Sequence, residues 1–216
     1  MSDDISPDDV LAATQGVRAR TIALLRSVDA EQLARIVPTC PAWTVKDLAA
    51  HMFGVGDDLL AGRLEGIGSA AWTDAQVERM REIPIDGLLD QWEASAAAFD
   101  QLVPHIPAPS NLQLVMDMAT HEHDIRLALG VPGAQDDPSL AVGAAYLLGG
   151  LRRGDPDLAA RIDGAGLSDF ELLRTLTGRR SMAQMEAAGI PADGVARMLE
   201  PSPMTIVADD LVEAQA

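Results

Sequence analysis

Histidines and a carboxylate stand at helical spacing in two separate segments of the chain. His51 is the single histidine of an otherwise apolar stretch, and a later segment contains Asp117 and His121, four residues apart. Because residues four apart in a helix lie on the same face, Asp117 and His121 can direct a carboxylate and an imidazole at one point. With His51 from a neighbouring helix, they would make a two-histidine, one-carboxylate metal site that leaves a coordination position open for chemistry.

The expected helix geometry separates the residues of the later segment into two groups. At about 100° per residue, His121 lies roughly 40° from Asp117, and Asp124 lies roughly 20° from it on the other side. All three border the apolar stripe, whereas His123 points about 120° away and does not belong to the same site. On spacing alone, an ordinary contact between neighbouring turns and a hydrogen-bonded core histidine are alternatives to metal binding.

The composition indicates that helices must position these residues. Apolar residues make up 48% of the 216 residues and aromatic residues only 3%. Ala, Leu and Met dominate the apolar set, which favours packed helices over sheets. The sequence therefore predicts a mostly α fold, organised as one sizeable domain or as one domain with a small appendage.

The first part of the chain, residues 1–132, is predicted to form a four-helix bundle. Caps and stop signals place a shorter helix from Thr73 to Arg81 between the second and third long helices. Bundle cores commonly build metal sites from inward side chains on facing helices. The long helices are expected from about Pro7 to Ser27, from the cap Thr44 to between Leu64 and Gly68, after Pro84 as far as Phe99, and from the cap Ser110 to Gly130.

Residues 133–216 are predicted to form a smaller, mainly helical C-terminal region with at most one or two short strands. Helices are expected from Pro138 to Arg153, from Ser168 to Leu176 and from Ser181 to Ala188. Met204 to Ala208 is the one credible strand, and a single strand is not stable alone.

The charge of the chain limits its expected partners. There are 33 acidic and 16 basic residues, a formal net charge of −17. This field repels phosphate backbones and anionic lipids, so neither a nucleic acid nor a membrane is an expected partner. The start of the chain lacks an apolar signal core, and the one cysteine, Cys40, cannot form an internal disulfide. We expect a cytoplasmic protein with a small-molecule substrate, and a homodimer is compatible with the sequence.

Three segments resemble one family. Cys40-Pro-Ala-Trp-Thr-Val-Lys-Asp-Leu-Ala-Ala-His51 resembles the signature of the mycothiol-dependent maleylpyruvate isomerase N-terminal domain family, which belongs to the DinB-like superfamily of four-helix bundle metalloproteins. Asp117-Met-Ala-Thr-His121-Glu-His-Asp124-Ile-Arg-Leu-Ala-Leu-Gly130 is similar to a second family motif, in which Glu usually stands at the position of Asp117. Residues 168–181 resemble a stretch common near the C-terminus of actinobacterial members. Within the first motif, Cys40 is expected to pack against Trp43.

The resemblance implies roles for five residues. His51, Asp117 and His121 would hold a metal, with Asp117 one methylene shorter than the usual glutamate. Asp124 would orient a ligand histidine and so serve catalysis, with a helix-anchoring carboxylate as the alternative. Arg179 would bind a carboxylate substrate or a thiol, with a solvated or interhelical role as the alternative.

The resemblance also implies an activity. A divalent metal would bind a low-molecular-weight thiol such as mycothiol as its thiolate, which would add to an electrophilic small molecule and give isomerisation or thiol transfer. Zinc is the metal that the ligand set favours most, and nickel, iron or manganese also suits it. Three alternatives stay open: a non-haem Fe(II) enzyme with the same triad, a non-catalytic metal-binding or dimeric interaction and regulatory bundle, and a DinB-type hydrolase, for which the sequence offers no nucleophile.

Overall fold

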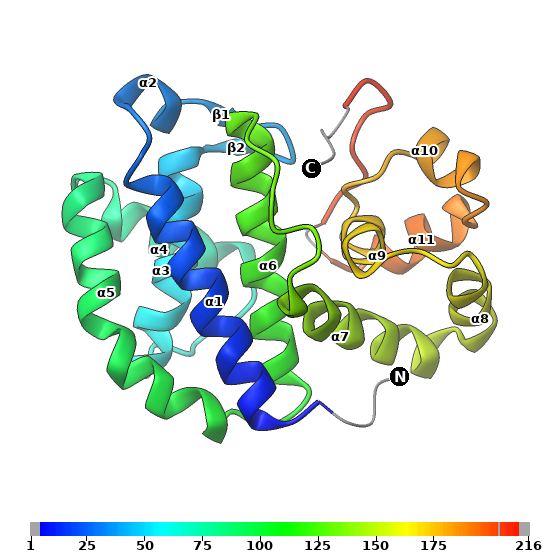
Figure 1. The fold of residues 1–216 in the computed structure, drawn as a ribbon, viewed down its shortest axis with the longest axis horizontal. Helices are drawn as coiled ribbons and strands as arrows, with labels where there is room; N and C mark the ends of the chain where they lie inside the picture. The colour runs from blue at the N-terminus through cyan, green and yellow to red at the C-terminus, as the bar shows by residue number, and fades with distance from the viewer. Residues whose placement is uncertain (1–4, 203, 212–216) are drawn as a thin grey trace.

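Helices dominate the structure, as the composition predicts (Figure 1). The computed structural model describes residues 5–202 and 204–211. Within these ranges, β structure is limited to a two-stranded antiparallel sheet of β1 (Ile36–Val37) and β2 (Cys40–Thr44). None of the helices in these ranges is long and apolar enough to cross a bilayer.

The N-terminal part of the chain is a helix bundle that makes up the left half of the molecule in Figure 1. The helix α1 packs against α6, and α3 packs against both α5 and α6. Fully buried apolar side chains such as Val17, Leu48 and Val115 fill the space between them. The bundle helices are α1 (Pro7–Leu25), α3 (Val45–Ala61), α5 (Ile85–Leu102) and α6 (Ser110–Leu129).

Capping explains where α3 begins. The Thr44 side chain accepts a hydrogen bond from the Asp47 backbone N–H, and the Asp47 carboxylate accepts one from the Thr44 N–H. This capping box, expected from the sequence, satisfies two N–H groups that the first helical turn cannot pair internally. Because Thr44 also ends β2, the short sheet fixes the direction in which α3 starts.

Two predicted caps were wrong. The helix α4 (Ala70–Met80) starts at Ser69, whose side chain accepts from the backbone N–H of residue 72, and Thr73 lies inside the helix. There the Thr73 hydroxyl donates to the Ser69 carbonyl one turn back, an alternative that threonine always has within a helix. Ser110 is the first residue of α6, and the preceding Pro109 provides no side-chain cap.

The connection between α1 and α3 contains structure that the sequence pattern did not indicate. A short helix α2 (Ala30–Leu33) is capped by Asp29, and the hairpin of β1 and β2 follows it. The strand β1 contacts α6. The hairpin therefore brings the first family-like motif, which begins at Cys40, against the helix that carries the second.

The C-terminal region is helical within the described residues. The predicted helices α7 (Pro138–Gly154), α9 (Asp169–Leu176) and α10 (Met182–Ala187) are confirmed, whereas α8 (Pro156–Gly164) and α11 (Ala192–Leu199) were missed. The predicted strand from Met204 to Ala208 was wrong. This segment pairs with no strand among the described residues, and its Val207 N–H donates to the backbone carbonyl of Gly178.

The helix α7 joins the two parts of the chain. It packs along α6 and α1 on one side and against α8 and α9 on the other (Figure 1). The buried apolar residues form one continuous cluster that extends from α1 to α11. The C-terminal helices are thus packed onto the same core as the bundle, and α9 reaches α6.

Candidate metal centre

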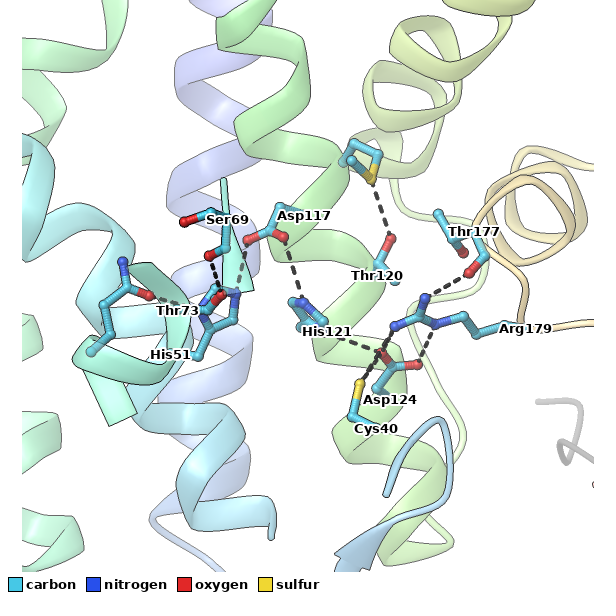
Figure 2. Close-up of polar contacts among 12 residues, drawn as sticks. Cys40, His51, Ser69, Thr73, Asp117, Thr120, His121, Asp124, Thr177 and Arg179 are labelled. Carbon is cyan, nitrogen blue, oxygen red and sulfur yellow. Dashed lines mark hydrogen bonds and ion pairs between the residues drawn. The ribbon is translucent and has the colours of Figure 1, made fainter. Parts of the chain in front are cut away.

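The structure brings together the three side chains expected to hold a metal (Figure 2). His51 projects from α3, and Asp117 and His121 project from α6. His51 Nε2 lies 3.5 Å from Asp117 Oδ2, and His121 Nε2 lies 3.5 Å from Asp117 Oδ1. One ligand atom from each residue lies within 4.8 Å of the other two.

The second nitrogen of each imidazole ring is occupied elsewhere. His51 Nδ1 lies 2.8 Å from the amide oxygen of Gln76 on α4. His121 Nδ1 lies 3.1 Å from Asp124 Oδ2, one turn along α6. Partners of this kind fix the orientation of a ligand histidine and leave its other nitrogen for the metal. Both Nε2 atoms therefore remain for the space beside Asp117.

The Asp117 carboxylate lacks adequate hydrogen bonds for a buried oxygen. Its two contacts with Nε2 atoms are long for hydrogen bonds, and Oδ2 has no hydrogen-bond partner among the described residues. Ligand atoms of a tetrahedral zinc site with bonds of about 2.1 Å stand roughly 3.4 Å apart. The observed separations of 3.5 Å match that spacing. His51, Asp117 and His121 therefore fit a divalent cation, and the shorter aspartate reaches the site.

Electrostatics also favour a positive charge at this point. Burial by itself would raise the pKa of Asp117, but the charge of His121 and its contact with the carboxylate hold this pKa below its ordinary value. Burial would likewise lower the pKa of His121, yet Asp117 and Asp124 raise it well above the usual value. The cluster thus favours a positive charge between these groups, which a bound cation would supply.

Asp124 is fully buried and holds two arginine side chains as well as His121. Arg174 Nη1 lies 2.7 Å from one carboxylate oxygen, and Arg179 Nη2 lies 2.7 Å from the other. Burial would raise the pKa of Asp124, but the two guanidinium charges hold it well below the ordinary value. An ionised carboxylate therefore faces His121 Nδ1 and accepts its proton in a hydrogen bond.

Arg179, the other residue implied by the resemblance, is directed into the protein. Each of its guanidinium nitrogens has a partner: Nε and Nη2 contact Asp124, and Nη1 donates to the Thr177 carbonyl at 2.6 Å. The preceding Gly178 makes this possible, since its φ is +79° and a Cβ there would lie 2.5 Å from the Thr205 carbonyl oxygen. The observed contacts join the turn between α9 and α10 to Asp124 on α6.

Cys40 and Trp43 have different neighbours at the site. Cys40 Sγ lies 3.9 Å from Asp124 Oδ2 and 3.6 Å from Arg179 Nη2. The Trp43 ring lies 5.2 Å from the His51 ring. Cys40, His121 and Asp124 also form a group with metal-ligand spacing. Because Asp124 already neutralises two guanidinium groups, this second group does not suit another cation.

Several residues around the site were not found by sequence reasoning. Gln76 and Arg174 carried no signal, because their contacts depend on how α4 and α9 pack against the bundle. Asp58 carried no signal either: it is 1% exposed, and Gln76 and Arg79 of α4 bind its carboxylate. His123, which was expected to point away from the site, packs against Phe170, with ring centres 4.8 Å apart.

Comparison with known families supplies the context. The family model described as mycothiol maleylpyruvate isomerase N-terminal domain matches residues 15–129, more than half of the chain. The chain belongs to this family. No curated protein and no solved structure matches it. The maleylpyruvate isomerase domain match includes both histidines, Asp117, Gln76 and Asp124, and it ends before Arg174 and Arg179.

Proposed function

We propose that the protein is a metal-dependent enzyme that activates a low-molecular-weight thiol, mycothiol or a similar compound, for addition to an electrophilic small molecule. The product would be an isomer, if the adduct reverses, or a thiol conjugate. The observation that carries this proposal is the Asp117 carboxylate, which lies between the Nε2 atoms of His51 and His121 and whose Oδ2 is buried without a hydrogen-bond partner among the described residues. Membership of the family supports it.

The proposed ligands divide the work at the centre. His51, Asp117 and His121 would hold the metal, for which zinc is our first choice by ligand type. A divalent metal bound there would supply the Lewis acid that turns a protonated thiol into a thiolate near neutral pH. Gln76 and Asp124 hold the two imidazole rings in their orientations, so that neither ring would have to reorient when the metal binds.

The exposure of the ligands suggests the side of approach. The Asp117 side chain is 32% exposed, whereas the side chains of His51 and His121 are 4% and 11% exposed. Thiol and substrate would therefore arrive on the Asp117 side. Asp124 and Arg179 lie behind His121 and would act through its orientation, not by touching the substrate. We further propose a cytoplasmic enzyme and leave nucleic acids and membranes out of its partners, in view of its charge.

Elemental analysis of the purified protein tests the proposal. Wild type should contain about one equivalent of a divalent metal, and His51→Ala and His121→Ala should each lose it. His105→Ala is the matched control, because His105 is exposed in the short 3₁₀ helix after α5 and should leave the metal content unchanged. Wild type without bound metal would contradict the proposal and favour a non-catalytic bundle.

Thiol binding tests the second half of the proposal. Addition of a small thiol to the cobalt-substituted protein should produce a thiolate-to-metal absorption band in wild type and His105→Ala. Metal without such a band would separate the metal site from the thiol reaction. Iron-dependent oxygen uptake instead of thiol binding would favour the non-haem iron alternative.

A further inference from the structure

A chain of buried polar groups extends from His51 away from the metal centre. His51 Nδ1 contacts the Gln76 amide oxygen at 2.8 Å, and Gln76 Nε2 donates to Asp58 Oδ2 at 2.8 Å. Asp58 Oδ1 accepts from Arg63 Nε at 2.5 Å and from Arg79 Nη2 at 2.6 Å. Gln76 is 0% exposed and Asp58 is 1% exposed, so water does not compete for these bonds.

The chemistry of Asp58 decides which way the Gln76 amide points. A carboxylate accepts hydrogen bonds and cannot donate them, and Asp58 Oδ1 pairs with the guanidinium groups of Arg63 and Arg79. The NH₂ group of Gln76 must therefore face Asp58, which leaves the carbonyl oxygen to face His51. An amide oxygen only accepts, so His51 must carry its proton on Nδ1. The lone pair of Nε2 is then directed toward Asp117.

A glycine on α3 allows this arrangement. A Cβ at Gly54 would lie 2.7 Å from Gln76 Cβ and 2.8 Å from Gln76 Cγ, closer than nonbonded carbon atoms approach. The helix α4 can therefore bring Gln76 over α3 and down to His51 only because residue 54 has no side chain. Helix interiors disfavour glycine, which costs about 1 kcal/mol relative to alanine, so the close approach offers a physical reason for its presence.

We infer that Gln76 and Asp58 are positioning residues that fix the proton of His51 on Nδ1 and so prepare Nε2 to bind the metal. The Asp58 carboxylate, which only accepts, fixes the orientation of the Gln76 amide, and this orientation fixes the tautomer of the His51 ring. This inference rests on the proposed metal site for its purpose, but the tautomer itself is a property of the metal-free protein. A purely structural role would require only that these buried groups be paired, in either orientation.

Nitrogen-15 NMR of the metal-free protein, at a pH where the ring is neutral, reports the tautomer directly. Wild type should show His51 protonated at Nδ1. In Gln76→Leu, which removes the acceptor, the ring should become a mixture of tautomers, and affinity for Zn²⁺ should fall about 10- to 100-fold. Gly54→Ala should give the same result with every polar group intact, because the new Cβ displaces Gln76.

Asp58→Asn is the sharpest variant. An asparagine can donate, so the Gln76 amide is free to turn its NH₂ group toward His51, and the proton should then move to Nε2 in a measurable fraction of molecules. Val77→Ala is the control for lost packing, since Val77 is buried in the same helix but makes none of these bonds. It should lower stability without changing the tautomer or the Zn²⁺ affinity.

The outcomes separate the inference from the proposed function. An unchanged Nδ1 tautomer and an unchanged Zn²⁺ affinity in the folded Gln76→Leu, Gly54→Ala and Asp58→Asn proteins would overturn the inference. So would a shift in Val77→Ala as large as theirs. If wild type binds no metal but the tautomer responds as expected, the proposed function fails and the positioning of His51 stands.

Discussion

The two histidines of the centre have similar positions but different support. His51 contacts a neutral amide, that of Gln76. The residues that support His51 lie on α3, α4 and the segment between them: Gln76, Asp58 and two arginines. His121 leans on a carboxylate, Asp124, which is held by two arginines from the C-terminal region. The first arrangement lies inside the residues that match the family model, and the second extends beyond them.

The difference shows that a supporting residue can orient a histidine ring with or without placing a charge next to it. An amide oxygen orients the proton of His51 without adding charge next to the site. A carboxylate orients His121 and also makes its ring a stronger electron donor to a metal. A buried carboxylate is costly unless it is paired, which explains why two guanidinium groups surround Asp124. The His121 side therefore couples the chemistry of the site to the stability of the fold more strongly than the His51 side does.

The test with the largest expected effect removes one arginine from the His121 side and, separately, one from the His51 side. Arg174 is 0% exposed, so Arg174→Met should leave buried charge on Asp124 undercompensated and lower the free energy of unfolding by about 3–5 kcal/mol. Arg79, whose side chain is 36% exposed, should contribute about 1 kcal/mol or less to the same quantity. Urea denaturation measures both, and equal losses would show that the two sides do not differ in this way.

A smaller effect is expected when Asp124 keeps its shape and loses its charge. Asp124→Asn can still accept the proton of His121 Nδ1, but the ring becomes a weaker donor. Affinity for Zn²⁺ should fall about 10- to 100-fold, measured by competition with a chromophoric chelator. Asp100→Asn is the control, because Asp100 also pairs with an arginine, Arg18, on another face of the bundle. An unchanged affinity in Asp124→Asn would mean that the carboxylate only anchors the helix.

His123 supplies the test with the smallest expected effect, since it is a buried histidine on the same helix whose ring packs against Phe170. Burial, followed by the charges of Arg174 and Arg126, lowers its pKa from 6.5 to about 3. Below pH 6.5 the unfolded chain binds a proton that the native state refuses, so stability is complete above that pH and declines by about 1.4 kcal/mol per unit as the pH falls toward 3.

The measurement is the difference in unfolding free energy between wild type and His123→Gln from pH 8 to pH 5. The difference should stay constant above pH 7 and then move against wild type on acidification, while groups common to both proteins cancel. A difference that stays constant throughout would contradict the lowered pKa. The result would also calibrate the contrast with His121, which two carboxylates push in the opposite direction.

Local patterns predicted the part of the candidate site that lies within one helix. Asp117 and His121 share a helix, so their common face follows from helical geometry, and the capping box at Thr44 fixed the start of the helix that carries His51. The identity of the four bundle helices followed from the same rules. Placing His51 beside Asp117 and His121 needed the family motifs, because the spacing of residues within one helix does not show which residues of a second helix lie nearby.

The supporting residues were beyond such reasoning. Gln76 reaches His51 only because Gly54 lets two helices approach closely, and Arg174 reaches Asp124 only after α9 packs on α6. Asp58 is buried because α4 covers it, and the sequence of its own helix does not indicate this contact. These contacts depend on packing between elements, which hydrophobic periodicity and caps do not specify.

The sequence separations of these contacts set an order of assembly for the nascent chain. His51 and Gln76 are 25 residues apart, whereas Arg174 and Arg179 lie 50 and 55 residues beyond Asp124, and Arg179 lies 139 residues beyond Cys40. Contacts between distant residues form later, because closing a longer loop costs more chain entropy. We therefore expect a chain emerging from the ribosome to complete the contacts of His51 first, because those of His121 need the last third of the protein.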